Sequence, residues 1–293
     1  MKIIDGKRLA NQLKDGLRVK TDKLANEGKR RPHLAAVLVG NNPASESYVR
    51  NKVRSCAQAG FESTLIRRPS DVSEAELLSV IEELNNNDAI DGFIVQLPLP
   101  KHIDEQKVLL SINPDKDVDG FHPMNFGKMA QGMDAFLPAT PYGILLMLAH
   151  YGIETSGKEV VVIGRSNIVG TPMSILLSRK AKLGNSTVTL VHSRTKDLKS
   201  HTLNADIIIA AIGIPKFLTP DMVKDGATII DVGINRVEDT TRKSGYRLVG
   251  DVDYEGLAPK VEFMTPVPGG VGPMTVLGLM KNTMKAYLKT VSV

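Results

Sequence analysis

Short apolar runs alternate with longer amphipathic stretches along nearly the whole chain, and this alternation limits the folds that the chain can adopt. The runs occupy residues 33–40, 63–68, 91–98, 158–164, 186–192, 205–213 and 226–233. They are rich in β-branched residues and apolar at successive positions, which is typical of parallel strands buried on both faces. The stretches between them fit crossover helices, so the sequence predicts an α/β protein.

Helix boundary signals agree with this assignment. Ser73 and Glu76 have the spacing of a capping box, in which each residue satisfies a free N–H group near the start of a helix. Gly60 and Gly152 stand where two predicted helices should end.

At 293 residues the chain exceeds one average domain. We expect two α/β domains with a cleft between them, the second of Rossmann type. The first would comprise residues 1–138 plus 270–293, and the second residues 139–269. The later boundary follows from the loop "TPVPGGVGP", which is too long and glycine-rich for a simple connector. The final helix, about residues 273–289, is expected to return to the first domain.

Composition narrows the classes of function. No apolar run reaches the ~18 residues of a membrane span, and the N-terminus lacks a signal or transit pattern. Cys56 is the only cysteine, as expected in a reducing compartment, so a cytoplasmic protein is predicted. The net charge of +5 is scattered among acids without interleaved aromatics, which favours small anionic ligands over nucleic acid or a membrane. Asp115, Asp117 and Asp119 alternate as in a calcium loop, but the terminal Glu is missing and no metal is expected.

The segment "GRSNIVGTP" after the run at 158–164 modifies the dinucleotide-binding fingerprint G-x-G-x-x-G. Ser166 replaces the second glycine, and the last glycine is displaced to Gly170. The physical requirements can still be met: Gly164 permits the tight turn, Ser166 can donate to a phosphate, and Gly170 lets a helix N-terminus approach a pyrophosphate. The segment therefore predicts a cofactor site, with a plain strand-to-helix turn as the alternative.

The next predicted strand ends in His192, Ser193 and Arg194, without the carboxylate that would hold the ribose hydroxyl of NAD. Together with Arg165, these side chains could bind a 2′-phosphate, so NADP is favoured over NAD. Arg194 as a solvated surface charge is the alternative. Gly213, Gly233 and Ile234 follow later strands, at the sheet edge where a nicotinamide would lie, although glycine after a strand is often only a turn.

Three residues of the predicted first domain are candidates for chemistry. Tyr48 and Lys52 are four apart on a predicted helix and so share one face, a spacing that also arises by chance. Gln96 ends a predicted strand before "LPLP", and strand ends are where α/β folds bind ligands.

Several long motifs occur together in one order: "YVRNKVRSCAQAG", "VQLPLP", "NPDKDVDGFHP", "GRSNIVGTP", "DVGINR" and "TPVPGGVGPMTV". In order and spacing the chain resembles the bifunctional methylenetetrahydrofolate dehydrogenase/methenyltetrahydrofolate cyclohydrolase family, from residue 3 to the final helix. The resemblance implies NADP-dependent oxidation of 5,10-methylenetetrahydrofolate to 5,10-methenyltetrahydrofolate and hydrolysis to 10-formyltetrahydrofolate, in a homodimer of one-carbon metabolism. The segments 178–186 and 237–248 look variable.

The resemblance also assigns residues. Lys52 would be the catalytic lysine, Gln96 would orient it, Tyr48 would pack on the aminobenzoyl ring, and Asp119 would hold the pterin ring. The folate site would further include Leu97, Pro268, Gly269 and Gly270. The NADP contacts would be Gly164, Arg165, Ser166, Ile168, Val169, Gly170, Pro172, Ser193, Arg194, Gly213, Gly233 and Ile234.

The chemistry suits this set of side chains. Two substrate nitrogens push out the hydride, so oxidation needs positioning more than acid–base help, whereas hydrolysis needs a group that passes protons. Lys52 could be that group. The alternatives are a monofunctional methylenetetrahydrofolate dehydrogenase, a hydroxy-acid or shikimate-type NADP dehydrogenase, and an NADP-sensing protein without activity.

Overall fold

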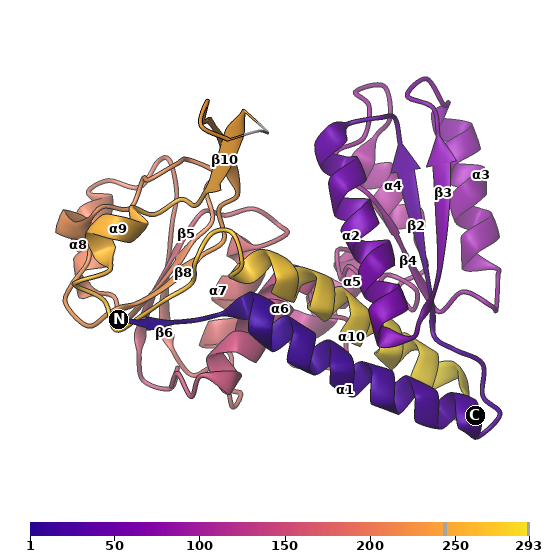
Figure 1. The fold of residues 1–293 in the computed structure, drawn as a ribbon, viewed down its shortest axis with the longest axis horizontal. Helices are drawn as coiled ribbons and strands as arrows, with labels where there is room; N and C mark the ends of the chain where they lie inside the picture. Colours follow the sequence, from indigo (N-terminus) through magenta and orange to yellow (C-terminus); the bar gives the residue numbers. More distant parts are fainter. Residues whose placement is uncertain (243–244, 292–293) are drawn as a thin grey trace. The chain divides into compact units, whose positions relative to one another are not determined.

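The computed structural model describes residues 1–242 and 245–291, and the chain forms two compact units (Figure 1). Unit 1 comprises Met1–Ala10 and Thr140–Thr275, and unit 2 comprises Asn11–Ala139 and Val276–Val293. Each unit combines parallel strands with helices, so the predicted two-domain α/β class is confirmed. The helices α1 (Gly6–Asn26), α6 (Ala139–His150) and α10 (Val271–Val291) have residues in both units.

Unit 2 contains a three-stranded parallel sheet in the order β3–β2–β4. Its strands are β2 (His33–Val39), β3 (Glu62–Arg68) and β4 (Gly92–Val95), and its own helices are α2 (Pro43–Ala59), α3 (Glu74–Asn85), α4 (Glu105–Ser111) and α5 (Pro123–Ala130). The predicted capping box of Ser73 and Glu76 is present at the start of α3. Alternate residues of β2 and β4, such as Val37 and Phe93, pack against α3 and α4 in one apolar core.

Unit 1 contains a six-stranded parallel sheet in the order β1–β11–β8–β7–β5–β6. Its strands are β1 (Lys2–Ile3), β5 (Glu159–Ile163), β6 (Thr187–Val191), β7 (Ile207–Ala210), β8 (Thr228–Asp231) and β11 (Phe263–Met264). Its own helices are α7 (Gly170–Ser178), α8 (Leu198–Asn204), η1 (Pro220–Met222) and α9 (Tyr254–Leu257). A separate antiparallel hairpin consists of β9 (Asn235–Glu238) and β10 (Tyr246–Val249).

The order of strands creates a switch point in the sheet of unit 1. The chain leaves β5 toward β6 on one side and then returns to β7 on the other, so β5 and β7 are neighbours whose connections run in opposite directions. Ligands of open α/β sheets bind where such connections diverge, at the carboxyl ends of the strands. The fold therefore places a ligand site beyond Ile163 and Ala210.

All seven predicted strands are present, but β1 and β11 were not predicted. These strands pair with each other through Lys2–Phe263 and Ile3–Met264. Because this pairing joins the N-terminus to the six-stranded sheet, residues 1–10 belong to unit 1 and not to the domain of residues 1–138 that the sequence suggested. Two-residue strands carry no periodicity, so only the tertiary pairing reveals them.

Asn282 on α10 is buried, and its Nδ2 donates to the carbonyl oxygens of Val118 and Leu137, each at 2.8 Å. Asn282→Ala should lower the free energy of unfolding, because a buried carbonyl left without a donor costs about 1–3 kcal/mol. Urea unfolding measures the change. Asn11→Ala, an exposed position on α1, is the matched control and should have little effect. Equal stability of the two variants would contradict the role of Asn282.

Candidate functional site

Lys52 and Gln96 meet inside unit 2. Lys52 lies on α2 and is buried, and Gln96 directly follows β4. The Nζ of Lys52 donates to Oε1 of Gln96 at 3.2 Å, while Nε2 of Gln96 donates to the carbonyl of Leu97 at 2.8 Å. The second bond fixes which end of the Gln96 amide faces Lys52. Lys52 makes no ion pair within the described residues, and an ammonium has three donors, so donors are left for a ligand.

Tyr48 lies one helical turn before Lys52 on α2, and its ring is among the exposed large side chains. The predicted shared face of these two residues is therefore present. Leu97 is partly buried, and its peptide bond to Pro98 is cis. The main-chain N–H of Gln96 donates to Val37 at 2.9 Å, which extends the β4 ladder by one residue and fixes the start of this turn.

Asp119 lies close enough to Lys52 for the two charges to interact. Burial raises the pKa of the Asp119 carboxyl above its ordinary value, and the charge of Lys52 opposes that shift. No hydrogen bond to this carboxylate is present within residues 1–242 and 245–291, although the side chain is largely desolvated. A desolvated carboxylate without a donor is costly unless a ligand supplies one. This makes Asp119 a candidate acceptor for a substrate N–H group.

The loop that carries Asp119 is held in place by other side chains. The buried Asp117 accepts from the main-chain N–H groups of Phe121 at 3.2 Å and His122 at 2.8 Å. Burial raises the pKa of Asp117 to about 6. Asn282 holds the carbonyl of Val118 from the other side. These hydrogen bonds fix the main chain on both sides of Asp117 and Val118, and thereby the position of Asp119.

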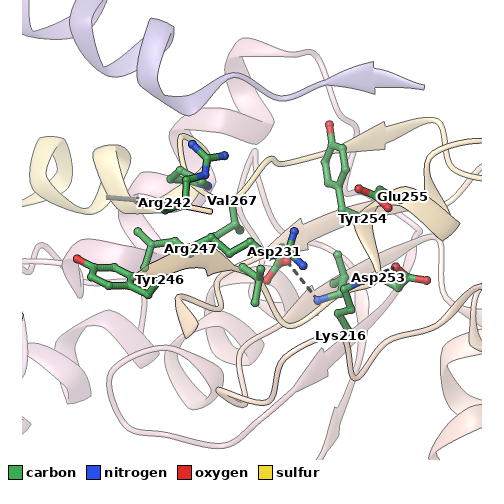
Figure 2. A pocket seen from close by; sticks show the side chains of 14 residues that line it. Lys216, Asp231, Arg242, Tyr246, Arg247, Asp253, Tyr254, Glu255 and Val267 are labelled. Atoms are coloured by element: carbon green, nitrogen blue, oxygen red, sulfur yellow. Dashed lines mark hydrogen bonds and ion pairs between the residues drawn. The ribbon is translucent and has the colours of Figure 1, made fainter. Parts of the chain in front are cut away.

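Pro268, Gly269 and Gly270 lie in unit 1, in the loop before α10. Gly269 has a φ of +109°, and its carbonyl accepts from the N–H of Lys7 at 2.7 Å. A Cβ on Gly6 would overlap the carbonyl of Gly270, so the N-terminal segment packs directly on this loop. Pro268 also lines a cavity of about 540 Å³ under the β9–β10 hairpin (Figure 2).

The turn after β5 has the geometry of an anion-binding loop. Gly164 has a φ of +114°, and a Cβ on Gly170 would overlap the Gly164 carbonyl, so glycine is required where α7 begins against the turn. The hydroxyl of Ser166 accepts from the N–H of Val169, the residue before α7, at 3.2 Å, and this bond closes the turn. Main-chain N–H groups of residues 165–168 donate to no acceptor within the described chain. These groups fit the pyrophosphate of a dinucleotide.

A cavity of about 410 Å³ lies at the switch point of the sheet. It is lined by Ile163, Gly164, Arg165, His192, Ser193, Leu198, Ala211, Ile212, Ile214 and Phe217. The segments after β5, β6 and β7 all contribute, as expected for a nucleotide site in this fold. Its walls are largely apolar, with the Arg165 guanidinium as a cation, and so suit a nucleoside that carries a phosphate.

Of the two arginines proposed for the 2′-phosphate, one lies in the turn after β6 and does not line the cavity. The turn is closed by its own bonds: the N–H of His192 donates to Oγ1 of Thr195 at 2.9 Å, and the N–H of Arg194 donates to Nδ1 of His192 at 3.2 Å. Ser193 lines the cavity together with Arg165, whereas Arg194 is exposed and does not line it. Arg165 is therefore better placed than Arg194 to bind a 2′-phosphate in this cavity.

The remaining predicted cofactor residues lie on the same edge of the sheet. Val169 and Pro172 are buried at the start of α7, and Ile168 is exposed beside them. Gly213 follows β7, while Gly233 and Ile234 follow β8. Ile234 is 43% exposed, so an apolar side chain faces solvent at this edge.

Sequence reasoning missed several residues at this edge. Ile214 and Phe217 line the cavity and are recognisable afterwards as apolar residues in the glycine- and proline-containing loop "GIPKF". Asp231 and Asp251 are buried and bind the main chain around Gly213 and Gly233. An aspartate near the end of a strand is common in a sequence, and nothing in the neighbouring residues indicates that it binds the main chain of other loops.

Across residues 1–242 and 245–291, no group of three or more His, Cys, Asp or Glu side chains is arranged to hold a metal ion. No helix of the described chain is both long and apolar enough to span a bilayer.

Both units match models of protein families. Residues 4–119 match the model described as tetrahydrofolate dehydrogenase/cyclohydrolase, catalytic domain. Residues 138–291 match tetrahydrofolate dehydrogenase/cyclohydrolase, NAD(P)-binding domain. The chain is 60% identical over 286 residues to the bifunctional protein FolD of Flavobacterium johnsoniae, covering 98% of this chain and 97% of that one. It is 55% identical over 291 residues to FolD of Bacteroides thetaiotaomicron, covering 99% of each.

The chain is also similar to solved structures over nearly its whole length. The bifunctional enzyme FolD of Campylobacter jejuni is 44% identical, with a TM-score of 0.93 and coverage of 99% of both chains. FolD of Trypanosoma brucei, solved with NADP cofactor and inhibitor, is 36% identical, with a TM-score of 0.94 and coverage of 99% of this chain and 98% of that one. The chain therefore belongs to the tetrahydrofolate dehydrogenase/cyclohydrolase family.

Proposed function

We propose that this chain oxidises 5,10-methylenetetrahydrofolate to 5,10-methenyltetrahydrofolate with NADP, and then hydrolyses that product to 10-formyltetrahydrofolate. The observation that carries the proposal is the set of Lys52, Gln96 and Asp119 in unit 2, combined with a dinucleotide site in unit 1. Family membership across both units supports the bifunctional activity over the monofunctional and shikimate-type alternatives. Growth of methenyl absorbance on mixing the protein with methylenetetrahydrofolate and NADP tests the first step.

In the oxidation, the chain has to bind and orient the reactants. NADP supplies a hydride acceptor when it is bound. The main-chain N–H groups of residues 165–168 would hold the pyrophosphate, Arg165 and Ser193 the 2′-phosphate, and Ile234 the apolar face of the ring. Gln96 would orient Lys52 beside the one-carbon unit.

In the hydrolysis, the chain has to move protons. Water attacks the methenyl carbon and loses a proton, and N5 gains a proton before it leaves. Lys52, held in place by Gln96, would take the proton from water as a neutral amine and return it to N5 as an ammonium. Asp119 would accept hydrogen bonds from the pterin amino and ring N–H groups, with Tyr48 against the aminobenzoyl ring and Leu97, Pro268, Gly269 and Gly270 as further folate contacts.

The assembly and location of the protein belong to the same proposal. We expect a homodimer in the cytoplasm without nucleic-acid or membrane partners, on the basis of the family resemblance and the dispersed charges. Sedimentation equilibrium of the purified chain measures the oligomeric state.

Arg165→Ala should weaken NADP binding roughly 10- to 150-fold while changing NAD binding little, because a hydrogen bond to a charged group contributes about 1.5–3 kcal/mol. Titration of each dinucleotide against the protein gives the two dissociation constants. Lys196→Ala removes the same charge from an exposed site nearby and is the control. Equal losses for NADP and NAD would remove Arg165 from the 2′-phosphate site.

The KM for 5,10-methenyltetrahydrofolate should rise as the pH falls, beginning at a higher pH than for an ordinary aspartate of pKa about 3.9. Burial raises the pKa of Asp119, so this carboxyl becomes protonated earlier on acidification, and the neutral form is a poor acceptor for pterin N–H groups. KM profiles of the cyclohydrolase reaction between pH 5 and 8 are compared with those of Asp119→Asn. That variant should have a high, pH-independent KM and near-normal NADP affinity. An unchanged KM in the variant would show that Asp119 does not bind folate.

Lys52→Met should reduce cyclohydrolase activity on the order of 10²–10⁴-fold, the usual effect of losing a general base, and reduce dehydrogenase activity less. Methenyltetrahydrofolate should then accumulate during turnover, which its absorbance reports. Arg54→Met, two residues along α2 on an exposed face, is the control. A parallel loss of both activities with folate and NADP still bound would make Lys52 an organiser of the site and not its proton carrier.

A further inference from the structure

Two carboxylates are buried at the carboxyl edge of the unit 1 sheet. Asp231 is the last residue of β8 and is 2% exposed, and Asp251 follows β10 and is 0% exposed. Within the described residues neither makes an ion pair with a cation. A buried carboxylate without a cation has to be satisfied by hydrogen-bond donors. The identity of those donors shows what the two side chains hold together.

Asp251 joins the segments that follow two neighbouring strands. Its Oδ2 accepts from the main-chain N–H of Ile212 at 2.7 Å and of Gly213 at 2.9 Å, just after β7. Its Oδ1 accepts from Nδ2 of Asn235, just after β8, at 2.9 Å. One side chain thereby sets the separation of the two loops.

Asp231 in turn holds the main chain at Asp251 by hydrogen bonds. Its Oδ1 accepts from the N–H of Gly233 at 3.0 Å and from the N–H of Asp251 itself at 2.9 Å. Its own N–H donates to the hydroxyl of Thr265 at 2.7 Å. Figure 2 shows Asp231 at the cavity under the hairpin, with Lys216 and Asp253 beside it. Burial, together with the nearby charge of Asp251, raises the pKa of Asp231 to about 7.

The glycines around this pair are required by the carboxylates. A Cβ on Gly233 would overlap Oδ1 of Asp251, and a Cβ on Gly250 would overlap Oδ2 of Asp231. Gly233 was expected to contact the cofactor, and the space beside its Cα is filled by a side chain of the protein. The absence of a side chain at Gly233 leaves room for the Asp251 carboxylate between the two loops.

The two loops present apolar side chains to solvent. Ile214 is 51% exposed and Ile234 is 43% exposed, and Ile214 also lines the 410 Å³ cavity. Both lie within two residues of groups that Asp251 binds. The bonds to Asp251 restrain these loops in addition to the pairing of Asn235 with Val249 in the β9–β10 ladder.

We propose that Asp251 is a positioning residue for the cofactor: its two oxygens hold the Ile212–Gly213 and Asn235 segments at the separation that the nicotinamide half of NADP requires. Asp251 is fully buried, so it would act through these main-chain and amide groups and not by contact with a ligand. The proposal rests on the proposed dehydrogenase function. A purely structural role is the competing explanation, and it predicts a general loss of stability.

The polarity of the Asp251–Asn235 pair allows a swap experiment. In Asp251→Ala, the Ile212 and Gly213 N–H groups and the Asn235 amide all lose their acceptor. Asp251→Asn is the conservative variant, because its amide oxygen can still accept from Ile212 and Gly213 while its N–H donates to the Asn235 amide, which turns over to present its oxygen. In the double variant Asp251→Asn/Asn235→Asp, the amide oxygen again accepts from Ile212 and Gly213 while its N–H donates to the new carboxylate. Glu255→Gln, on α9 and four residues along, removes a charge from an exposed side chain that makes no hydrogen bond or ion pair to either loop within the described residues, and is the matched control.

The readouts separate positioning from stability. Dissociation constants for NADPH are measured by fluorescence titration, amide hydrogen exchange is followed at residues 212–213, and cyclohydrolase activity is assayed without cofactor. For Asp251→Ala we expect NADPH binding weakened about tenfold or more, faster exchange at 212–213, and cyclohydrolase activity within about twofold of the native protein. Asp251→Asn and the double variant should recover most of the NADPH affinity, and Glu255→Gln should be unchanged.

Two results would overturn the proposal. One is native NADPH affinity in Asp251→Ala despite faster exchange at 212–213. The other is a joint fall of NADPH affinity, cyclohydrolase activity and unfolding midpoint without recovery in Asp251→Asn or the double variant. If Asp251→Ala fails to fold, Asn235→Ala removes a single donor and should still weaken NADPH binding with normal cyclohydrolase activity. A native protein that binds NADPH but does not oxidise methylenetetrahydrofolate would contradict the proposed function instead.

Discussion

The cofactor site depends on the parallel pairing of β5 with β7. The register matches Val160 with Ile207 and Ile163 with Ala210, so the two strands end at the same level. The ladder continues one step further, because the N–H of Ala211 donates to the carbonyl of Ile163 at 2.9 Å. Beyond that point the connections diverge, and main-chain groups after the two strands are left for partners outside the sheet. The turn at Gly164, the cavity and the loops bound by Asp251 all begin from this edge.

Unit 2 has a similar arrangement of three parallel strands, but its strand ends present a different kind of polar group. The order β3–β2–β4 also places two diverging connections beside each other, after β2 and β4. Here the strand ends supply side chains more than main-chain groups: Gln96 follows β4 and reaches Lys52 on α2, the helix that follows β2. Proton transfer needs titratable groups in fixed positions, and a buried lysine held by an amide near an unpaired carboxylate meets that need.

The sequence was informative wherever a feature depends on neighbouring residues. The β-branched runs, the Ser73–Glu76 capping box and the glycines around Gly164 are local, and each was predictable from propensity or backbone geometry. Features set by distant pairs were not predictable. β1 forms only by pairing with β11, some 260 residues away, and this pairing places residues 1–10 in unit 1. Lys52 and Gln96 were recognised as candidates, but the bond between them depends on how α2 packs on the sheet.

Asp231 and Asp251 illustrate the limit most clearly. A carboxylate after a strand indicates a ligand or a turn, and nothing local shows that its partners are N–H groups of other loops. Their environment explains why a dehydrogenase site would use such a pair. Hydride transfer requires correct placement and no proton exchange, so carboxylates satisfied by main-chain donors can hold the loops without taking part in the chemistry. Hydrolysis places the opposite demand on Lys52 and Asp119, which need spare hydrogen-bonding capacity. The two reactions proposed for this chain therefore call for differently satisfied polar groups, and each unit carries one kind.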